Sequence, residues 1–268
     1  MPVFCPIKFK ILTDDEFRSL DYQVMAHVFA SHNEMSRLCD EDIYKADVAA
    51  RLEADGLGPV RTEVPVDVTW RSFSKRYFLD LVVQDSHLYE LKCALTLVGE
   101  HKSQLLNYVL LLALRTAKLL NFRPPQVETW FASSRLTLEA RQRVTCDATQ
   151  WRELTPAFAA FRAALMEMLG ELGAFLDLAL YESLLADFFG GENEVVRRVE
   201  LHRDSHTLGS QRCHLLAPDV GFRLTAHTEE LSQARSQLVR WLAHTRLRAL
   251  QWVNLNRTNI EFVTLTRP

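Results

Sequence analysis

The chain has 268 residues, of which 48% are hydrophobic and 24% are charged, and its formal net charge is -3. This balance is typical of a globular protein with one large or two modest domains, and it excludes a disordered or fibrous chain. The small negative charge provides no global attraction for nucleic acid, so any such affinity must come from a local patch.

The cysteines and the apolar segments bear on the cellular compartment. The five cysteines are scattered and lack CxxC spacing, which argues against a zinc site or a disulfide framework. The first residues do not resemble a signal peptide, and the most apolar stretch, residues 105–114, is too short to cross a membrane. We therefore expect a cytoplasmic protein with no membrane partner.

The first half of the chain alternates between helical and strand-like patterns. Helical spacing of apolar residues runs from Asp14 to about Glu53 and ends at the Gly-Leu-Gly-Pro segment, residues 56–59. The elements expected after it are strands at 62–70, 76–83 and 87–93, a helix at 99–115, and strands at 118–122 and 127–131. This order predicts an α/β fold, a small mixed sheet flanked by helices.

The second half contains a helical connector followed by a similar order of elements. These are helices within 156–189, strands near 195–201, 213–216 and 221–226, a helix at 229–242, and strands at 249–255 and 260–265. We place the domain boundary after residue 150, which gives domains of residues 1–150 and 151–268.

An offset of 133 residues superposes the two halves without a gap. Ser103-Gln104-Leu105 falls on Ser236-Gln237-Leu238, and Asn121 falls on Asn254. Only eight positions between residues 79 and 131 are identical, so the common register of strand, helix and strands is the better argument for duplication. Coincidence between two amphipathic α/β stretches is the alternative.

Three polar residues lie within the apolar hairpin predicted at 76–93. Asp80 interrupts an apolar strand, and Glu90 and Lys92 share one face of the next strand because strand side chains alternate. Carboxylates from adjacent strands are hard oxygen ligands suited to Mg²⁺ or Mn²⁺, and a neighbouring lysine can activate water and stabilise phosphate charge. Gln104 and Tyr108, four residues apart on the next helix, can add a polar wall. A Glu-x-Lys strand by itself is more often a solvated edge or a salt bridge.

In the offset alignment, the second half lacks this polar set. Asp80 falls on Cys213, Glu90 on Arg223 and Lys92 on Thr225. We therefore expect one metal site in the first half and a degenerate copy in the second half that keeps only the scaffold.

These residues resemble the PD-(D/E)XK nuclease superfamily and, more closely, the GxxExxY protein family, over residues 20–131. The matching positions are His32, Glu41, Tyr44, Asp80-Leu81-Val82-Val83, Glu90-Leu91-Lys92, His101, Gln104-Leu105-Leu106-Asn107-Tyr108 and Leu119-Leu120-Asn121-Phe122. The chain departs from the family where two glycines fall on Ser36 and Leu38, in a loop and not in the carboxylate set.

The resemblance implies a metal-dependent nuclease with a restriction-endonuclease-like core. Glu41 becomes the first acidic residue of the site, although acids at a helix start are also favoured by the helix dipole. Tyr44, His32 and His101 become candidates for contact with nucleic acid or metal, although a lone histidine is more often a structural hydrogen-bonding residue.

A basic segment near the end of the chain is the candidate patch for nucleic acid. Arg235, Arg240, Arg246, Arg248 and Arg257 occur without an intervening acidic residue, and Trp241, His244 and Trp252 are interleaved with them. Arginines can bind phosphates and aromatic rings can stack on bases, but a solvated arginine face over a tryptophan-containing core explains the pattern equally well. The two halves are also candidates for an intramolecular pseudo-dimer.

Two functions follow from these observations. The first is a Mg²⁺- or Mn²⁺-dependent nuclease acting on DNA or RNA, with Asp80, Glu90 and Glu41 as metal ligands and Lys92, Gln104 and Tyr108 completing the site. The second is a non-catalytic module that keeps the nuclease fold and binds nucleic acid or protein.

Overall fold

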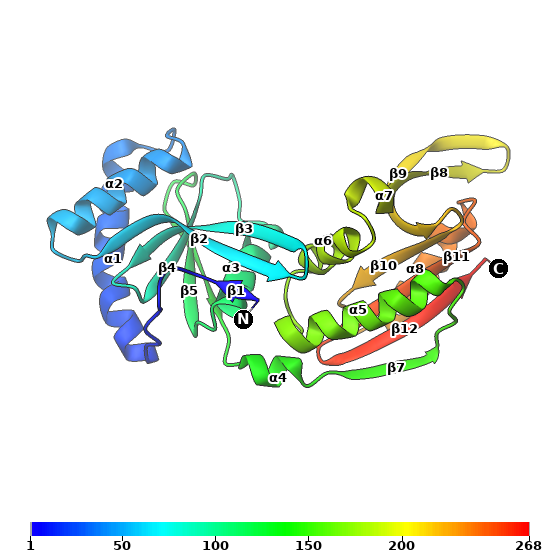
Figure 1. Ribbon diagram of the computed structural model, residues 1–268. Coiled ribbons are helices and arrows are strands. Elements are labelled where there is room, and N and C mark those ends of the chain that lie inside the picture. Colours follow the sequence, from blue (N-terminus) through cyan, green and yellow to red (C-terminus); the bar gives the residue numbers. More distant parts are fainter. Residues whose placement is uncertain (1, 268) are drawn as a thin grey trace. The chain divides into compact units, whose positions relative to one another are not determined.

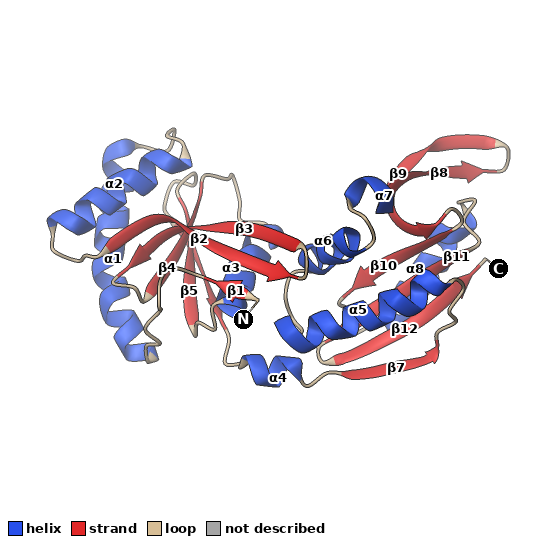
Figure 2. Ribbon diagram, viewed as in Figure 1, coloured by secondary structure: helices blue, strands red, loops and turns tan. Residues whose placement is uncertain are grey.

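The structure is a computed structural model that describes residues 2–267, and the chain divides into two compact units. The first unit holds residues 2–69 and 74–137, and the second holds residues 70–73 and 138–267. Each unit contains a six-stranded mixed sheet with packed helices, as Figures 1 and 2 show. The mixed α/β class expected from the sequence is therefore confirmed.

The first unit follows the order predicted from the sequence, with a short additional strand at its start. Its elements are β1 (Val3–Phe4), α1 (Asp14–Met35), α2 (Glu41–Ala54), β2 (Val60–Trp70), β3 (Phe73–Val83), β4 (His87–Lys92), α3 (Gly99–Leu111), β5 (Thr116–Asn121) and β6 (Glu128–Ser133). The strands lie in the sheet in chain order from β1 to β6. β4 and β5 are parallel, and α3 makes the crossover that a parallel pair requires.

Helices cover both faces of this sheet. Val24 of α1 and Val48 of α2 pack with Leu81 and Leu91 of the sheet in one core. Leu105 of α3 packs on the opposite face, in a second core. The alternation of strand side chains therefore assigns β4 residues in turn to the α1–α2 face and to the α3 face.

The single helical run predicted from Asp14 to Glu53 is two helices. Thr13 caps α1 in a capping box with Glu16, and the helix ends at Ser36. Ser36 has a φ of 63°, a conformation that glycine favours. The chain turns at this residue, and α2 begins at Glu41.

The second unit begins earlier than the sequence boundary suggests. Its elements are α4 (Leu138–Gln142), β7 (Thr145–Gln150), α5 (Pro156–Leu172), α6 (Leu178–Phe188), α7 (Glu192–Val195), β8 (Val196–Arg203), β9 (His206–Ala217), β10 (Val220–Thr225), α8 (Leu231–Ala243), β11 (Ala249–Asn256) and β12 (Asn259–Thr266). The sequence places the boundary after residue 150, whereas the structure groups residues 138–150 with the second unit. The reason is that β7 pairs in parallel with β12 at the edge of the second sheet.

The second sheet repeats the strand pairing of the first. Tyr89 pairs with Lys118 between β4 and β5, and Phe222 pairs with Gln251 between the parallel strands β10 and β11. Each residue of the second pair lies 133 positions after its counterpart in the first pair, which is the offset found in the sequence. As α3 connects the first pair, α8 connects the second.

A side-chain hydrogen-bond pattern is also repeated at this offset. Asn121 accepts from the Ala94 amide and donates to the Ala94 carbonyl and to Glu128. Asn254 makes the corresponding three bonds with His227 and Glu261. The same set of asparagine hydrogen bonds therefore occurs at corresponding positions of the two sheets.

Among residues 2–267, no helix combines the length and the hydropathy that a bilayer span demands.

Candidate functional site

The structure brings together four of the site residues predicted from the sequence. Lys92 Nζ lies 2.8 Å from Glu90 Oε1, 3.7 Å from Glu41 Oε1 and 3.9 Å from Asp80 Oδ2. Three acidic oxygens from α2, β3 and β4 thus surround one ammonium group. We call Glu41, Asp80, Glu90 and Lys92 the carboxylate–lysine cluster.

Asp80 lies where β3 and β4 separate. Backbone pairing runs from Val83 opposite His87 to Leu81 opposite Tyr89. Next to this paired region, the Asp80 side chain and not the backbone binds β4. Its Oδ2 accepts from the Leu91 amide at 2.8 Å, and this hydrogen bond is buried. Asp80 therefore has two roles. Its side chain accepts a hydrogen bond from β4 where the backbone pairing of β3 with β4 stops, and it is a member of the carboxylate–lysine cluster.

Glu90 is the most buried acid of the cluster, with 1% of its surface exposed. Its Oε1 accepts from Lys92 and from Gln104 Nε2, each at 2.8 Å. Its Oε2 is buried and has no hydrogen-bond partner among the described residues. Burial raises the pKa of Glu90 to about 8, and the nearby charge of Asp80 acts in the same direction.

The pKa values of Glu41 and Lys92 are shifted by burial and by the other charges of the cluster. Burial raises the pKa of Glu41, against the opposing effect of Lys92. Burial would lower the pKa of Lys92, but the surrounding Glu90, Asp80 and Glu41 outweigh burial and raise it. The lysine consequently stays protonated, and it holds the acids together electrostatically.

Gln104 and Tyr108 lie on the α3 side of Glu90, as their spacing predicts. Gln104 Nε2 donates to Glu90 and to the Tyr108 hydroxyl, the latter at 2.9 Å. Burial raises the pKa of Tyr108, so this hydroxyl remains protonated. The pair fixes the orientation of the Glu90 carboxylate.

Lys45 is a member of the site that the sequence interpretation missed. Its Nζ lies 3.6 Å from Asp80 Oδ1 and 2.8 Å from Asp42 Oδ1, and it also pairs with Glu63. Lys45 is buried, and it follows Glu41 by one helical turn. The sequence did contain a signal for Lys45, namely a lysine one helical turn after an acidic residue at the start of a helix.

Two of the candidates for nucleic-acid contact are structural. Tyr44 is fully buried, stacks on Phe122 with ring centroids 4.4 Å apart and donates to the Ser36 carbonyl. His32 is buried and bonds the Pro124 carbonyl at 3.1 Å. Neither side chain presents a surface to nucleic acid, which corrects the expectation from the sequence. His101 remains partly exposed at the start of α3, where its Nδ1 accepts from the Val98 amide.

The arginines near the end of the chain are exposed, but not all of the aromatic residues between them are exposed. Arg235, Arg240, Arg246, Arg248 and Arg257 are all exposed. Arg248 pairs with Asp219 at 2.9 Å. Trp252 is buried and donates to Thr225, so the expectation that it stacks on bases is wrong.

One observation in particular favours the binding of a divalent cation by the carboxylate–lysine cluster. Across residues 2–267, no three His, Cys, Asp or Glu side chains meet closely enough to form a metal cage. The Glu90 oxygen without a partner is nevertheless a buried acceptor, the charges of Asp80 and Glu41 act on Glu90, and carboxylate oxygens are the ligands that Mg²⁺ and Mn²⁺ prefer.

Comparison with known proteins gives one match. No curated protein and no solved structure gives a match to the chain. Residues 18–131, which contain the whole carboxylate–lysine cluster, match the family model of the PD-(D/E)XK nuclease superfamily.

Proposed function

We propose that the chain is a Mg²⁺- or Mn²⁺-dependent nuclease that hydrolyses phosphodiester bonds of DNA or RNA at the carboxylate–lysine cluster. The observation that carries the proposal is the buried, unpartnered Glu90 oxygen beside Asp80 and Lys92. Oε1 of this carboxyl accepts from Lys92 and Gln104, but a buried oxygen without a partner is unfavourable, and a bound cation would satisfy Oε2. The superfamily match over residues 18–131 and the GxxExxY resemblance support the same chemistry.

Each residue of the cluster has a role in this proposal. Asp80 and Glu90 would hold the metal ion, with Glu41 assisting from α2. The bound cation would supply Lewis-acid stabilisation of phosphate charge and a lowered pKa for water. Lys92 would position the attacking water and offset the charge of the transition state, and Gln104 would keep the Glu90 carboxylate oriented.

Purified protein should cleave single- or double-stranded DNA or RNA with Mg²⁺ or Mn²⁺ and stop when the metal is chelated. Lys92→Ala should lower the cleavage rate by about a hundredfold or more, because one preorganised charge at the reacting phosphate is lost. Cleavage of labelled substrates in gels or by fluorescence checks both results.

Lys102→Ala is the matched control, because Lys102 lies on α3 of the same unit and its Nζ lies over the Trp130 ring, 5.7 Å from the ring centroid. Its cleavage rate should equal that of the parent. A protein that binds nucleic acid but cuts no strand with either metal, and that is unchanged by Lys92→Ala, would be the non-catalytic module instead.

We further propose that the second unit is a degenerate copy of the nuclease fold. The repeated strand pairing and the repeated asparagine hydrogen bonds support a duplication. In this copy Cys213, Arg223 and Thr225 replace Asp80, Glu90 and Lys92. The replacements remove both strand carboxylates, so this unit would not hold a metal ion in the same way.

Nucleic-acid binding by this protein would use the exposed arginines of the second unit. Arg240→Ala and Arg246→Ala should each make the dependence of log affinity on log salt shallower by about 0.9 for duplex DNA, if each arginine neutralises one phosphate. Fluorescence anisotropy in a chelator, which prevents cleavage, measures this slope. Arg162→Ala removes an arginine already paired with Glu153 and should leave the slope unchanged; unchanged slopes for all three variants would place the binding surface elsewhere.

A further inference from the structure

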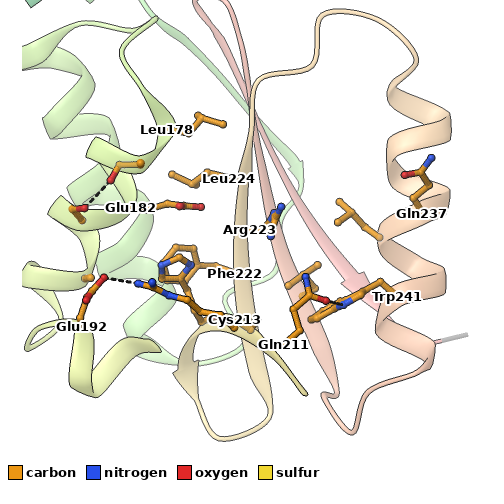
Figure 3. A pocket seen from close by; sticks show the side chains of 17 residues that line it. Leu178, Glu182, Glu192, Gln211, Cys213, Phe222, Arg223, Leu224, Gln237 and Trp241 are labelled. Atoms are coloured by element: carbon orange, nitrogen blue, oxygen red, sulfur yellow. Dashed lines mark hydrogen bonds and ion pairs between the residues drawn. The ribbon is translucent and has the colours of Figure 1, made fainter. Parts of the chain in front are cut away.

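The second unit contains a cavity of about 770 Å³ between α6, β9, β10 and α8. Figure 3 shows the side chains that line it. This volume lies in the range of pockets that enclose a small organic ligand. No part of the cavity belongs to the carboxylate–lysine cluster, which lies in the first unit.

The cavity occupies the place in the second sheet that the carboxylate–lysine cluster occupies in the first. Four of its lining residues are Cys213, Arg223, Gln237 and Trp241. At the offset of 133 residues these correspond to Asp80, Glu90, Gln104 and Tyr108 in that order. The corresponding registers of β4 with β5 and of β10 with β11 make this correspondence structural as well as sequential.

The replacements reverse the charge of the site. Glu90, a carboxylate, becomes Arg223, whose guanidinium makes no hydrogen bond and no ion pair among the described residues. Cys213 is a neutral group, because burial raises the pKa of its thiol to about 11. Arg212, the other arginine of the cavity, is already paired with Glu192. One guanidinium without a hydrogen bond therefore remains in the site, where its charge also acts on Glu182, and guanidinium is a preferred partner of phosphate.

The walls of the cavity suit a flat ring system. Trp241 is held in place by a 3.0 Å hydrogen bond from its Nε1 to Gln211. Figure 3 shows Glu182 of α6 and Trp241 of α8 on opposite sides of Arg223. A partly buried carboxylate can accept hydrogen bonds from amino or hydroxyl groups, and a tryptophan face can stack on a base.

We propose that this cavity binds a nucleoside phosphate without a metal ion. Its phosphate is held by Arg223, its base lies against Trp241, and Glu182 accepts from a base or sugar donor. The ligand is either a free nucleotide or one nucleotide of a strand, since the recognised chemistry is the same. Binding here does not depend on cleavage at the first unit.

Isothermal titration calorimetry of the full chain in chelator tests this proposal with three probes: the common nucleoside monophosphates, a short single-stranded oligonucleotide and inorganic phosphate. We expect saturable binding of a monophosphate, or of the oligonucleotide alone if the cavity takes a nucleotide within a strand. Arg223→Glu should weaken this binding by at least about tenfold, as loss of a charge-assisted contact requires.

Three variants separate this site from other arginines, test the tryptophan and control for misfolding. Arg162→Ala changes an arginine of α5 that lies outside the cavity and is paired with Glu153, and it should leave nucleotide affinity unchanged. Trp241→Leu should weaken nucleotide binding and leave phosphate binding alone. Arg223→Lys keeps the charge and should retain part of the affinity, and circular dichroism checks that each variant is folded.

The proposal is overturned if neither nucleotides nor the oligonucleotide bind in chelator, or if Arg223→Glu leaves their affinity intact. Inorganic phosphate that binds as tightly as every nucleotide would also overturn it, because the base would then contribute nothing.

Discussion

Asp80→Asn should abolish metal-dependent cleavage while the protein stays folded. The substitution removes one negative charge from the proposed metal site, and we expect the cleavage rate to fall by at least about a hundredfold. The asparagine oxygen can still accept from the Leu91 amide, so the separation of β3 and β4 is kept. Lys45 retains Asp42 and Glu63 as partners. Cleavage assays and chemical denaturation of the same preparation measure the two effects.

Comparison with Asp80→Ala separates the chemical role of this residue from its structural role. Alanine leaves the buried Leu91 amide without its acceptor, which should lower the free energy of unfolding by about 1–3 kcal/mol in addition to the loss of cleavage. Asp67→Asn is the matched control, because Asp67 is a partly exposed β2 carboxylate that is paired with Arg76 and lies outside the cluster. Full cleavage by Asp80→Asn would contradict the assignment of Asp80 to the metal site.

Local periodicity was sufficient to predict the geometry around Glu90. Alternation along a strand puts Glu90 and Lys92 on one face, and helical spacing puts Gln104 and Tyr108 on the facing side of α3. The structure has Lys92 and Gln104 donating to the same Glu90 oxygen. Each of these relations depends on residues close in sequence, so the pattern contained the information.

Relations between distant elements were harder to predict. Lys45 comes from a helix, Glu63 from β2 and Asp80 from β3, and only the tertiary fold brings Lys45 to both acids. β7 was missed because an exposed, polar edge strand carries no apolar alternation. Such contacts are set by the assembled sheet and not by local pattern.

The burial of Tyr44 could have been predicted. It precedes Val48 and Leu52 at helical spacing, and all three are fully buried in the core between α1, α2 and the sheet. The same helix directs Glu41 towards Lys92 from its first turn. The family resemblance made both residues site candidates, whereas the helical periodicity of the buried residues distinguishes the core tyrosine from the acid at the start of the helix.

Stability should depend on pH through Glu90, and metal should change this dependence. The pKa of Glu90 is raised from its ordinary value of 4.5 to about 8 in the folded chain. Between these values the unfolded chain has lost a proton that the folded chain retains. The free energy of unfolding should therefore fall as pH rises from about 5 to 8, by up to roughly 1.4 kcal/mol per pH unit from this group.

Glu90→Gln should remove most of this slope, because the amide does not titrate. The difference in the free energy of unfolding between the variant and the parent should thus increase in favour of the variant from pH 5 to pH 8, measured by chemical denaturation in chelator. Some slope should remain, because the pKa of Glu41 is raised by burial as well. Glu100→Gln, at an exposed position at the start of α3, should follow the parent at every pH.

Addition of Mg²⁺ tests whether this unfavourable ionisation serves cation binding. A cation binds the ionised carboxylate, so millimolar Mg²⁺ should raise the melting temperature of the parent more at pH 8 than at pH 6. Glu90→Gln should respond weakly at both pH values. Parallel pH profiles for parent and variant, together with equal responses to Mg²⁺, would mean that Glu90 neither titrates in this range nor binds the ion. The cluster would then be a buried ion-pair network that stabilises the junction of α2, β3 and β4 and has no role in hydrolysis.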